Sequence, residues 1–174
     1  PGGNAVAIGR DAIADGVYTG ADAIAIGRSS LRALTSGNYN VAVGTQALTS
    51  NTTASYNTAV GYQSLYANTT GALNTALGYQ ALEDATTASN NTAVGTQASN
   101  KNTTGASNSA FGEGSLFTNT TGSFNTAYGR QSLFSNTTAS NNTAVGYQAG
   151  YSNTTWASNT AVGHSALYSN TTGN

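Results

Sequence analysis

The chain has 174 residues, of which none is cysteine or methionine, one is proline and 11 are charged (five Lys or Arg and six Asp or Glu). Without cysteine there is no disulfide scaffold and no cysteine-based metal site, and we expect no cofactor. Five scattered cations are too few to displace the counterions of a nucleic acid, which excludes that partner. No stretch reaches the ~18 apolar residues of a membrane helix, so we expect no direct membrane insertion by this segment.

Small and polar residues make up most of the chain: 29 Ala, 28 Thr, 21 Gly, 21 Asn and 19 Ser, together 118 of 174 residues. This composition is common in disordered chains, but a strict internal repeat argues for a fold. A glycine that follows an alanine and an apolar residue recurs every 17 residues from Gly27 onward, and Gly9 precedes it by 18. We therefore predict one domain over residues 1–174, with coils that begin near residues 5, 23, 40, 57, 74, 91, 108, 125, 142 and 159.

Residues 57–73 typify the repeat, and we number their positions one to seventeen. From Asn40 onward, position one is always Asn, position three Ala, position five Gly and positions thirteen and fourteen Thr-Thr. Such a unit is too short for a helical-hairpin repeat. Alternation over residues 57–60 predicts a short strand, a second short strand fits residues 62–66, and Asn-Thr-Thr-Gly predicts the return loop. Two strands and two turns make one coil of an all-β, parallel β-solenoid.

Stacked coils place equal positions above one another at about 4.8 Å. The Asn side chains at position one are then expected to form a hydrogen-bonded ladder of Asn57, Asn74, Asn91, Asn108, Asn125, Asn142 and Asn159. Position three is never larger than Ala, so we expect it to point into a narrow interior and position four to point outward. Position four is apolar in every coil, and such a stripe needs a partner surface. We predict a homo-oligomer whose axis runs parallel to the rod.

Two N-terminal segments, Asn4-Ala-Val-Ala-Ile-Gly-Arg-Asp-Ala and Asp22-Ala-Ile-Ala-Ile-Gly-Arg-Ser-Ser, resemble the YadA-like head repeat of trimeric autotransporter adhesins. Later copies, such as Asn142-Thr-Ala-Val-Gly-Tyr-Gln-Ala, resemble a close variant found in bacterial surface proteins and phage tail fibres. The resemblance covers the whole chain and implies a left-handed β-roll, a homotrimer and a role in binding surfaces. The chain departs from the family in its longer turn, and in the Thr or Ser that replaces the apolar residue at position two after Val6, Ile24 and Val41.

The leading hypothesis is a structural and adhesive fibre segment, extracellular, on a bacterial cell surface or a virion fibre such as a phage tail fibre. Its partners would be its own copies and a host-surface protein or glycan. An ice-binding β-solenoid is one alternative, although the adjacent Thr-Thr residues point to opposite sides of an extended segment. A polysaccharide-degrading fibre enzyme is another, which the scarcity of acids disfavours. Because the chain stops within its tenth unit, we expect it to be part of a longer protein.

No catalytic constellation is evident in the sequence, and we expect no enzymatic activity. His164 is the only histidine. The acidic residue nearest to it in sequence, Glu113, lies three coils away, or roughly 14 Å by strand spacing. A catalytic contact needs about 3 Å. The carboxylate pairs Asp11/Asp15 and Glu83/Asp84 are interpreted as solvated turn residues, and His164 as a surface residue.

Position six varies widely among the coils, which indicates an exposed site. Tyr there supplies amphipathic contact area at low entropic cost. The candidate recognition residues are Tyr62, Tyr79, Arg130, Tyr147, Trp156 and His164. The alternative for the aromatic residues is packing between coils as ladders, which is favoured for Phe117 and Phe134. Trp156 is either a local contact point or a plug over an imperfect coil at Gly150.

Asparagine also heads many potential glycosylation sequons. Nine of these are Asn51, Asn68, Asn90, Asn102, Asn119, Asn136, Asn141, Asn153 and Asn170. Because most of them recur at one position of the repeat, we interpret them as turn residues rather than glycan acceptors.

Overall fold

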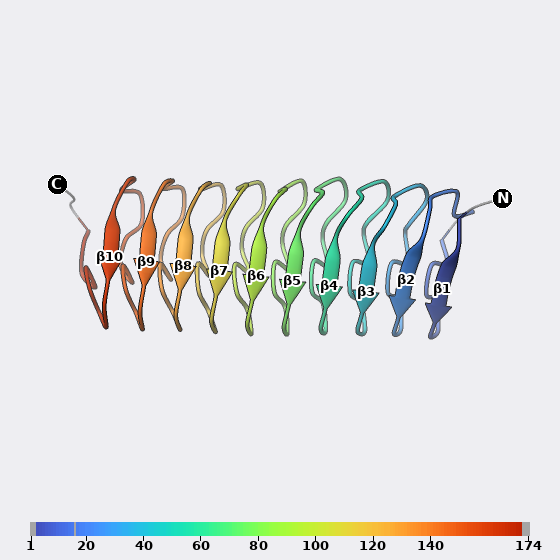
Figure 1. Cartoon of the computed structure of the whole chain (residues 1–174), viewed down its shortest axis with the longest axis horizontal. Helices are drawn as coiled ribbons and strands as arrows, with labels where there is room; N and C mark the ends of the chain where they lie inside the picture. Colours follow the sequence, from blue (N-terminus) through green and yellow to red (C-terminus); the bar gives the residue numbers. More distant parts are fainter. Residues whose placement is uncertain (1–2, 16, 172–174) are drawn as a thin grey trace.

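The computed structural model describes residues 3–15 and 17–171 and shows an elongated β-solenoid (Figure 1). These residues include ten strands and no helix. The strands are β1 (Ala5–Ile8), β2 (Ala23–Ile26), β3 (Val41–Val43), β4 (Thr58–Val60), β5 (Thr75–Leu77), β6 (Thr92–Val94), β7 (Ser109–Phe111), β8 (Thr126–Tyr128), β9 (Thr143–Val145) and β10 (Thr160–Val162). The predicted all-β solenoid is confirmed. Residues 1–2, 16 and 172–174 of the predicted domain lie outside the described residues.

All ten strands form one parallel sheet in chain order, with about nine turns between the first and the last. Equal positions of successive repeats are paired, so that Ala59 lies beside Ala42 and Ala76. The first step alone spans 18 residues, from Ala5 to Ala23. The strands run across the long axis of a rod, and the two termini lie at its opposite ends (Figure 1).

The interior of each coil is a narrow column of small side chains and one leucine. Alanine at position three points inward and is buried, as Ala59 is, whereas position four points outward, as predicted. Position eight holds buried Ala or Ser, and the hydroxyl of Ser64 is satisfied by donating to the Gly61 carbonyl at 3.1 Å. Leucine at position nine, such as Leu65, fills the remaining space and is fully buried. This column is continuous along the rod and replaces a two-layer core.

The second predicted strand, over residues 62–66, is wrong. This segment is a turn in which Gln63 and Leu65 have φ of 53° and 50°, in the left-handed region. The alternating conformation sends successive amide groups to opposite neighbours. Gln63 N–H donates to Thr45 O in the preceding coil at 3.1 Å, and Leu65 N–H donates to Ala81 O in the next coil at 3.0 Å. The hydrogen bonds between coils therefore continue without a strand.

Glycine at position five is required by both conformation and stacking. Gly61 has φ of 134°, which side chains rarely adopt. A Cβ atom at Gly61 would also clash with the backbone oxygen of Gly78 in the next coil. The same combination recurs at this position along the rod, which explains why the glycine is the clearest mark of the repeat.

Asparagine forms two buried ladders. At position one, the Oδ1 atom of Asn40 accepts the backbone N–H of Asn57 at 3.0 Å, and the pattern continues coil by coil through Asn74, Asn91, Asn108, Asn125, Asn142 and Asn159. The expected ladder is therefore present, but its regular bond joins a side chain to the next backbone. Direct amide-to-amide bonds are regular at position twelve, where Asn136 Nδ2 donates to Asn119 Oδ1 at 2.9 Å.

Three substitutions interrupt these internal columns. Ala85 replaces asparagine at position twelve, and Ser99 and Gly150 replace leucine at position nine. Buried polar atoms without a hydrogen-bond partner include Asn68 Oδ1, which faces the coil of Ala85, and Ser99 Oγ. A small cavity with room for about one water molecule lies beside Gly150, between Leu133 and Leu167.

Candidate recognition surface

The outer strand face consists of the side chains at positions two and four of every coil. It contains no charged residue. At the N-terminal end both positions are apolar, as in Ile24 and Ile26, which are exposed. Further along, position two is mostly threonine while position four stays apolar, as in Thr75 and Leu77 of β5. The parallel sheet therefore presents a regular, uncharged and partly apolar surface along the whole rod.

The side chains at position six form an exposed column, here called column six. Tyr62 and Tyr79 stack in it with ring centroids 5.5 Å apart and planes at 13°. Nearer the C-terminus, Arg130 donates from Nε to Glu113 at 3.1 Å and lies over the Tyr147 ring, 5.8 Å from its centroid. Because neighbouring rings cover one another, mainly their edges face solvent, and open ring faces occur where a stack ends.

Column ten, the side chains at position ten, contains a longer aromatic stack. Phe117, Phe134, Tyr151 and Tyr168 follow one another with centroids 5.0–5.2 Å apart and planes within 9°. This arrangement is the predicted packing of Phe117 and Phe134 between coils. Toward the N-terminus the stack ends, because Glu83 and Asn100 occupy the next two places before Tyr66.

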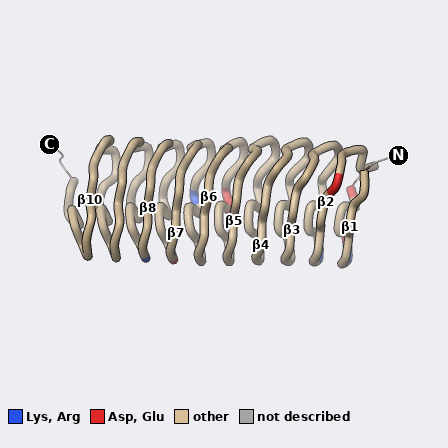
Figure 2. Tube along the Cα trace, in the orientation of Figure 1, with Lys and Arg blue, Asp and Glu red and all other residues tan. Residues whose placement is uncertain are grey.

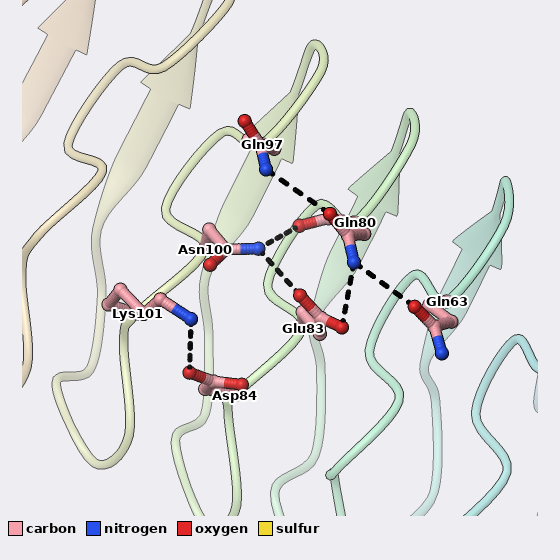
Figure 3. Close-up of polar contacts among 7 residues, drawn as sticks. All are labelled: Gln63, Gln80, Glu83, Asp84, Gln97, Asn100 and Lys101. Carbon is pink, nitrogen blue, oxygen red and sulfur yellow. Dashed lines mark hydrogen bonds and ion pairs between the residues drawn. The ribbon is translucent and has the colours of Figure 1, made fainter.

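A polar cluster fills this interruption (Figure 3). The carboxylate of Glu83 accepts from Gln80 Nε2 at 3.0 Å and from Asn100 Nδ2 at 2.9 Å. Asn100 is 1% exposed and also donates to the backbone oxygen of Gln80 at 2.9 Å. Asp84 points away from Glu83 and pairs with Lys101 at 3.0 Å. Glu83 is thus half-buried and held by neighbours, which the interpretation as a solvated turn residue missed.

A ladder of glutamine amides runs beside this cluster at position seven. Gln80 Nε2 donates to Gln63 Oε1 at 3.1 Å, and Gln97 Nε2 donates to Gln80 Oε1 at 3.2 Å. The ladder stops after Gln97, because Gly114 occupies the next place. Neither this ladder nor the cluster was proposed from the sequence. The signal was present in column eleven, where Asp84 and Lys101 are the only charged residues among small ones.

The remaining charges are few and lie mainly near the N-terminus (Figure 2). Asp15 pairs with Arg32 at 2.8 Å, and this hydrogen bond raises the pKa of Arg32 further above its ordinary value. Tyr18 donates its hydroxyl to Ala21 O at 2.8 Å, and burial, followed by the charge of Asp22, raises the pKa of its phenol.

His164 and Trp156 lie at the C-terminal end. The Nδ1 atom of His164 is 3.1 Å from Ser165 Oγ, and its exposed ring lies against Tyr147. Trp156 is exposed and donates from Nε1 to Thr171 O at 3.0 Å. The cavity beside Gly150 is lined by other residues, so Trp156 does not plug it. Within the described residues, no three His, Asp or Glu side chains come close enough to share a metal ion.

The sequon asparagines divide into two groups. Those at position twelve are buried in the amide ladder, among them Asn51, Asn102 and Asn119, so the folded chain does not expose their side chains. Asn90 and Asn141, at position seventeen, are exposed. The position-twelve asparagines are therefore structural, in a ladder rather than only in a turn.

Comparison of the chain with protein-family models, with curated proteins and with solved structures gives no match. The fold class of the protein is thus a parallel β-solenoid repeat protein, and its resemblance to YadA-like heads remains an interpretation of the repeat motif. No helix of the described residues has the length and hydrophobicity to cross a membrane.

Proposed function

We propose that this solenoid is a structural and adhesive fibre segment, a left-handed β-roll that assembles as a homotrimer and carries a binding surface for a host protein or glycan. It would act outside the cell, on a bacterial surface or a phage tail fibre. The observation that carries the proposal is the outer strand face, which is uncharged and apolar at position four along the whole rod. Isolated apolar side chains at a surface are ordinary, but a continuous stripe indicates a partner.

Identical chains fit this face because every coil has the same step. Three parallel rods would bring equal coils to the same level, so apolar side chains meet apolar side chains throughout. The face is most apolar in the first coils, where Ile8 and Ile26 are 58% and 37% exposed. The assembly would leave columns six and ten available for recognition.

Sedimentation velocity at micromolar concentration tests the assembly. We expect about three times the 17.4 kDa mass of one chain. Leu77→Lys places a charge in the proposed seam and should yield monomers, whereas Thr70→Lys adds the same charge at an exposed loop position and should leave the trimer intact. A monomeric wild-type chain would contradict the proposal.

Ice binding is a second candidate, because the structure adds an observation in its favour. Thr58 and Val60, Thr92 and Val94, and the other Thr-Ala-Val strands project Thr and Val outward in register from one sheet. This array differs from the Thr-Thr pairs, of which the first residue hydrogen-bonds the next coil, as Thr69 does with Thr86 O at 3.1 Å. Ice and a trimer seam would need the same face. A thermal-hysteresis gap in a monomeric protein would establish the ice-binding role in place of the trimer.

A further inference from the structure

The interruptions of the ladders are concentrated in two adjacent coils, residues 74–90 and 91–107. The departures there are Ala85 at position twelve, Ser99 at position nine, Glu83 and Asn100 in column ten, and Asp84 and Lys101 in column eleven. They have an energetic consequence, since Asn68 Oδ1 and Ser99 Oγ are buried without a hydrogen-bond partner. Where a regular fold departs from its own rule at such a cost, a functional site is expected.

The surface groups of these coils are held in place by one another. Asn100 is almost fully buried, and its Nδ2 atom fixes Glu83 at 2.9 Å while also bonding the Gln80 backbone at 2.9 Å. Gln80 approaches the same carboxylate from the other side (Figure 3). A carboxylate fixed in this way is preorganised, so a ligand would not have to order it.

Hydrogen-bonding capacity remains on both sides of the cluster. Each oxygen of Glu83 accepts one bond in the structure, and a carboxylate offers about four acceptor sites. Lys101 Nζ has three donors and uses one for Asp84. Spare acceptors and donors within a few ångströms are what neighbouring hydroxyl groups of a sugar require.

Aromatic rings flank the cluster within column ten. Phe117 stacks on Phe134 on one side only, and its other neighbour in the column is Asn100. Tyr66 has Thr49 and Glu83 as column neighbours, so no ring covers either of its faces from within the column. The C–H faces of a sugar ring pack against such rings, as apolar surface does generally.

The charge of the cluster restricts the ligand. Glu83 and Asp84 carry two negative charges, and Lys101 carries one positive charge. Since the balance is negative, sialic acids, uronic acids and sulfated sugars are disfavoured.

We propose that the polar cluster of Gln80, Glu83, Asp84, Gln97, Asn100 and Lys101 binds a neutral saccharide, with Glu83 accepting hydrogen bonds from two adjacent hydroxyl groups and Tyr66 or Phe117 packing against the ring. This inference rests on the proposed adhesive function and specifies its receptor chemistry.

A glycan array with defined neutral, sialylated and sulfated oligosaccharides, probed with the labelled full chain, tests the proposal. We expect binding to neutral glycans only. Glu83→Gln keeps the shape of the side chain but removes its charge, and should weaken binding by about tenfold or more. Asp15→Asn is the matched control, because Asp15 also pairs with a cation of the following coil but lies outside the cluster.

A double variant separates binding from folding. Glu83→Tyr with Asn100→Phe continues the aromatic stack through the interruption, so it should melt no lower than wild type and should lose glycan binding. Retained binding in this variant, or binding confined to anionic glycans, would overturn the saccharide site. Adhesion of wild-type chain to host cells that survives enzymatic removal of their glycans would overturn it too, while leaving the adhesive function standing. Absence of both glycan binding and cell adhesion would contradict both.

Discussion

Restoring the missing asparagine at position twelve should stabilise the protein. Ala85 interrupts the amide ladder between Asn68 and Asn102, and Asn68 Oδ1 is left without a partner. The intact part of the ladder shows what the Ala85→Asn substitution would form. Asn119 Nδ2 donates to Asn102 Oδ1 at 3.0 Å and to Gly122 O at 2.9 Å, and its Oδ1 accepts from the next asparagine at 2.9 Å.

The magnitude follows from these three hydrogen bonds. At about 1 kcal/mol net for each bond, they contribute about 3 kcal/mol. Ordering the new side chain costs about 1 kcal/mol, which leaves a gain of about 2 kcal/mol. For a chain of this length that corresponds to a rise in Tm of about 4–8 °C.

Guanidinium unfolding, with thermal melts alongside, measures the change. The midpoint for Ala85→Asn should rise with an unchanged slope, because the surface exposed on unfolding stays the same. Asn119→Ala, the reverse change, should lose about 3 kcal/mol. Ala67→Asn, at a half-exposed position outside the ladder, should have little effect. If Ala85→Asn lowers the midpoint, the buried ladder does not stabilise the rod in the way described.

Three further substitutions test other features. Gly61→Ala should cost roughly 3 kcal/mol or more, since it meets both a positive φ and the backbone of Gly78, whereas Gly114→Gln, at φ of 61° among glutamines of similar φ, should be tolerated; melting both variants compares them, and equal stability would refute the stacking argument. Gly150→Leu should fill the cavity and raise the free energy of unfolding by about 1 kcal/mol, as measured in guanidinium; a lower value would show that the coil cannot close around it. Because the pKa of Tyr18 is raised on folding, its contribution is complete below its ordinary pKa of 10.0 and is lost as the pH rises through the folded value. Tyr18→Phe should weaken this alkaline loss in unfolding titrations, and an unchanged profile would contradict the assignment.

The repeat pattern was sufficient to predict the strand, the turn after it and the coil length. Ala59 had to be small and inward because its column admits nothing larger, and Gly61 had to be glycine. The polar cluster was not predicted, because Glu83 and Asn100 belong to different repeats and meet only after stacking. Their place in one column could be read from the sequence, but their mutual hydrogen bonds depend on side-chain direction.

The sequence by itself determined the register of this protein, since identical positions at a constant spacing can pair in only one way along a parallel stack. The tertiary structure decided the conformation of residues 62–66, because side chains alternate both in a strand and in a chain of alternating φ. It also decided which asparagines bond to each other. Position one lies next to a strand and reaches the next backbone amide, whereas position twelve lies inside the turn, where only the neighbouring carboxamide is within reach.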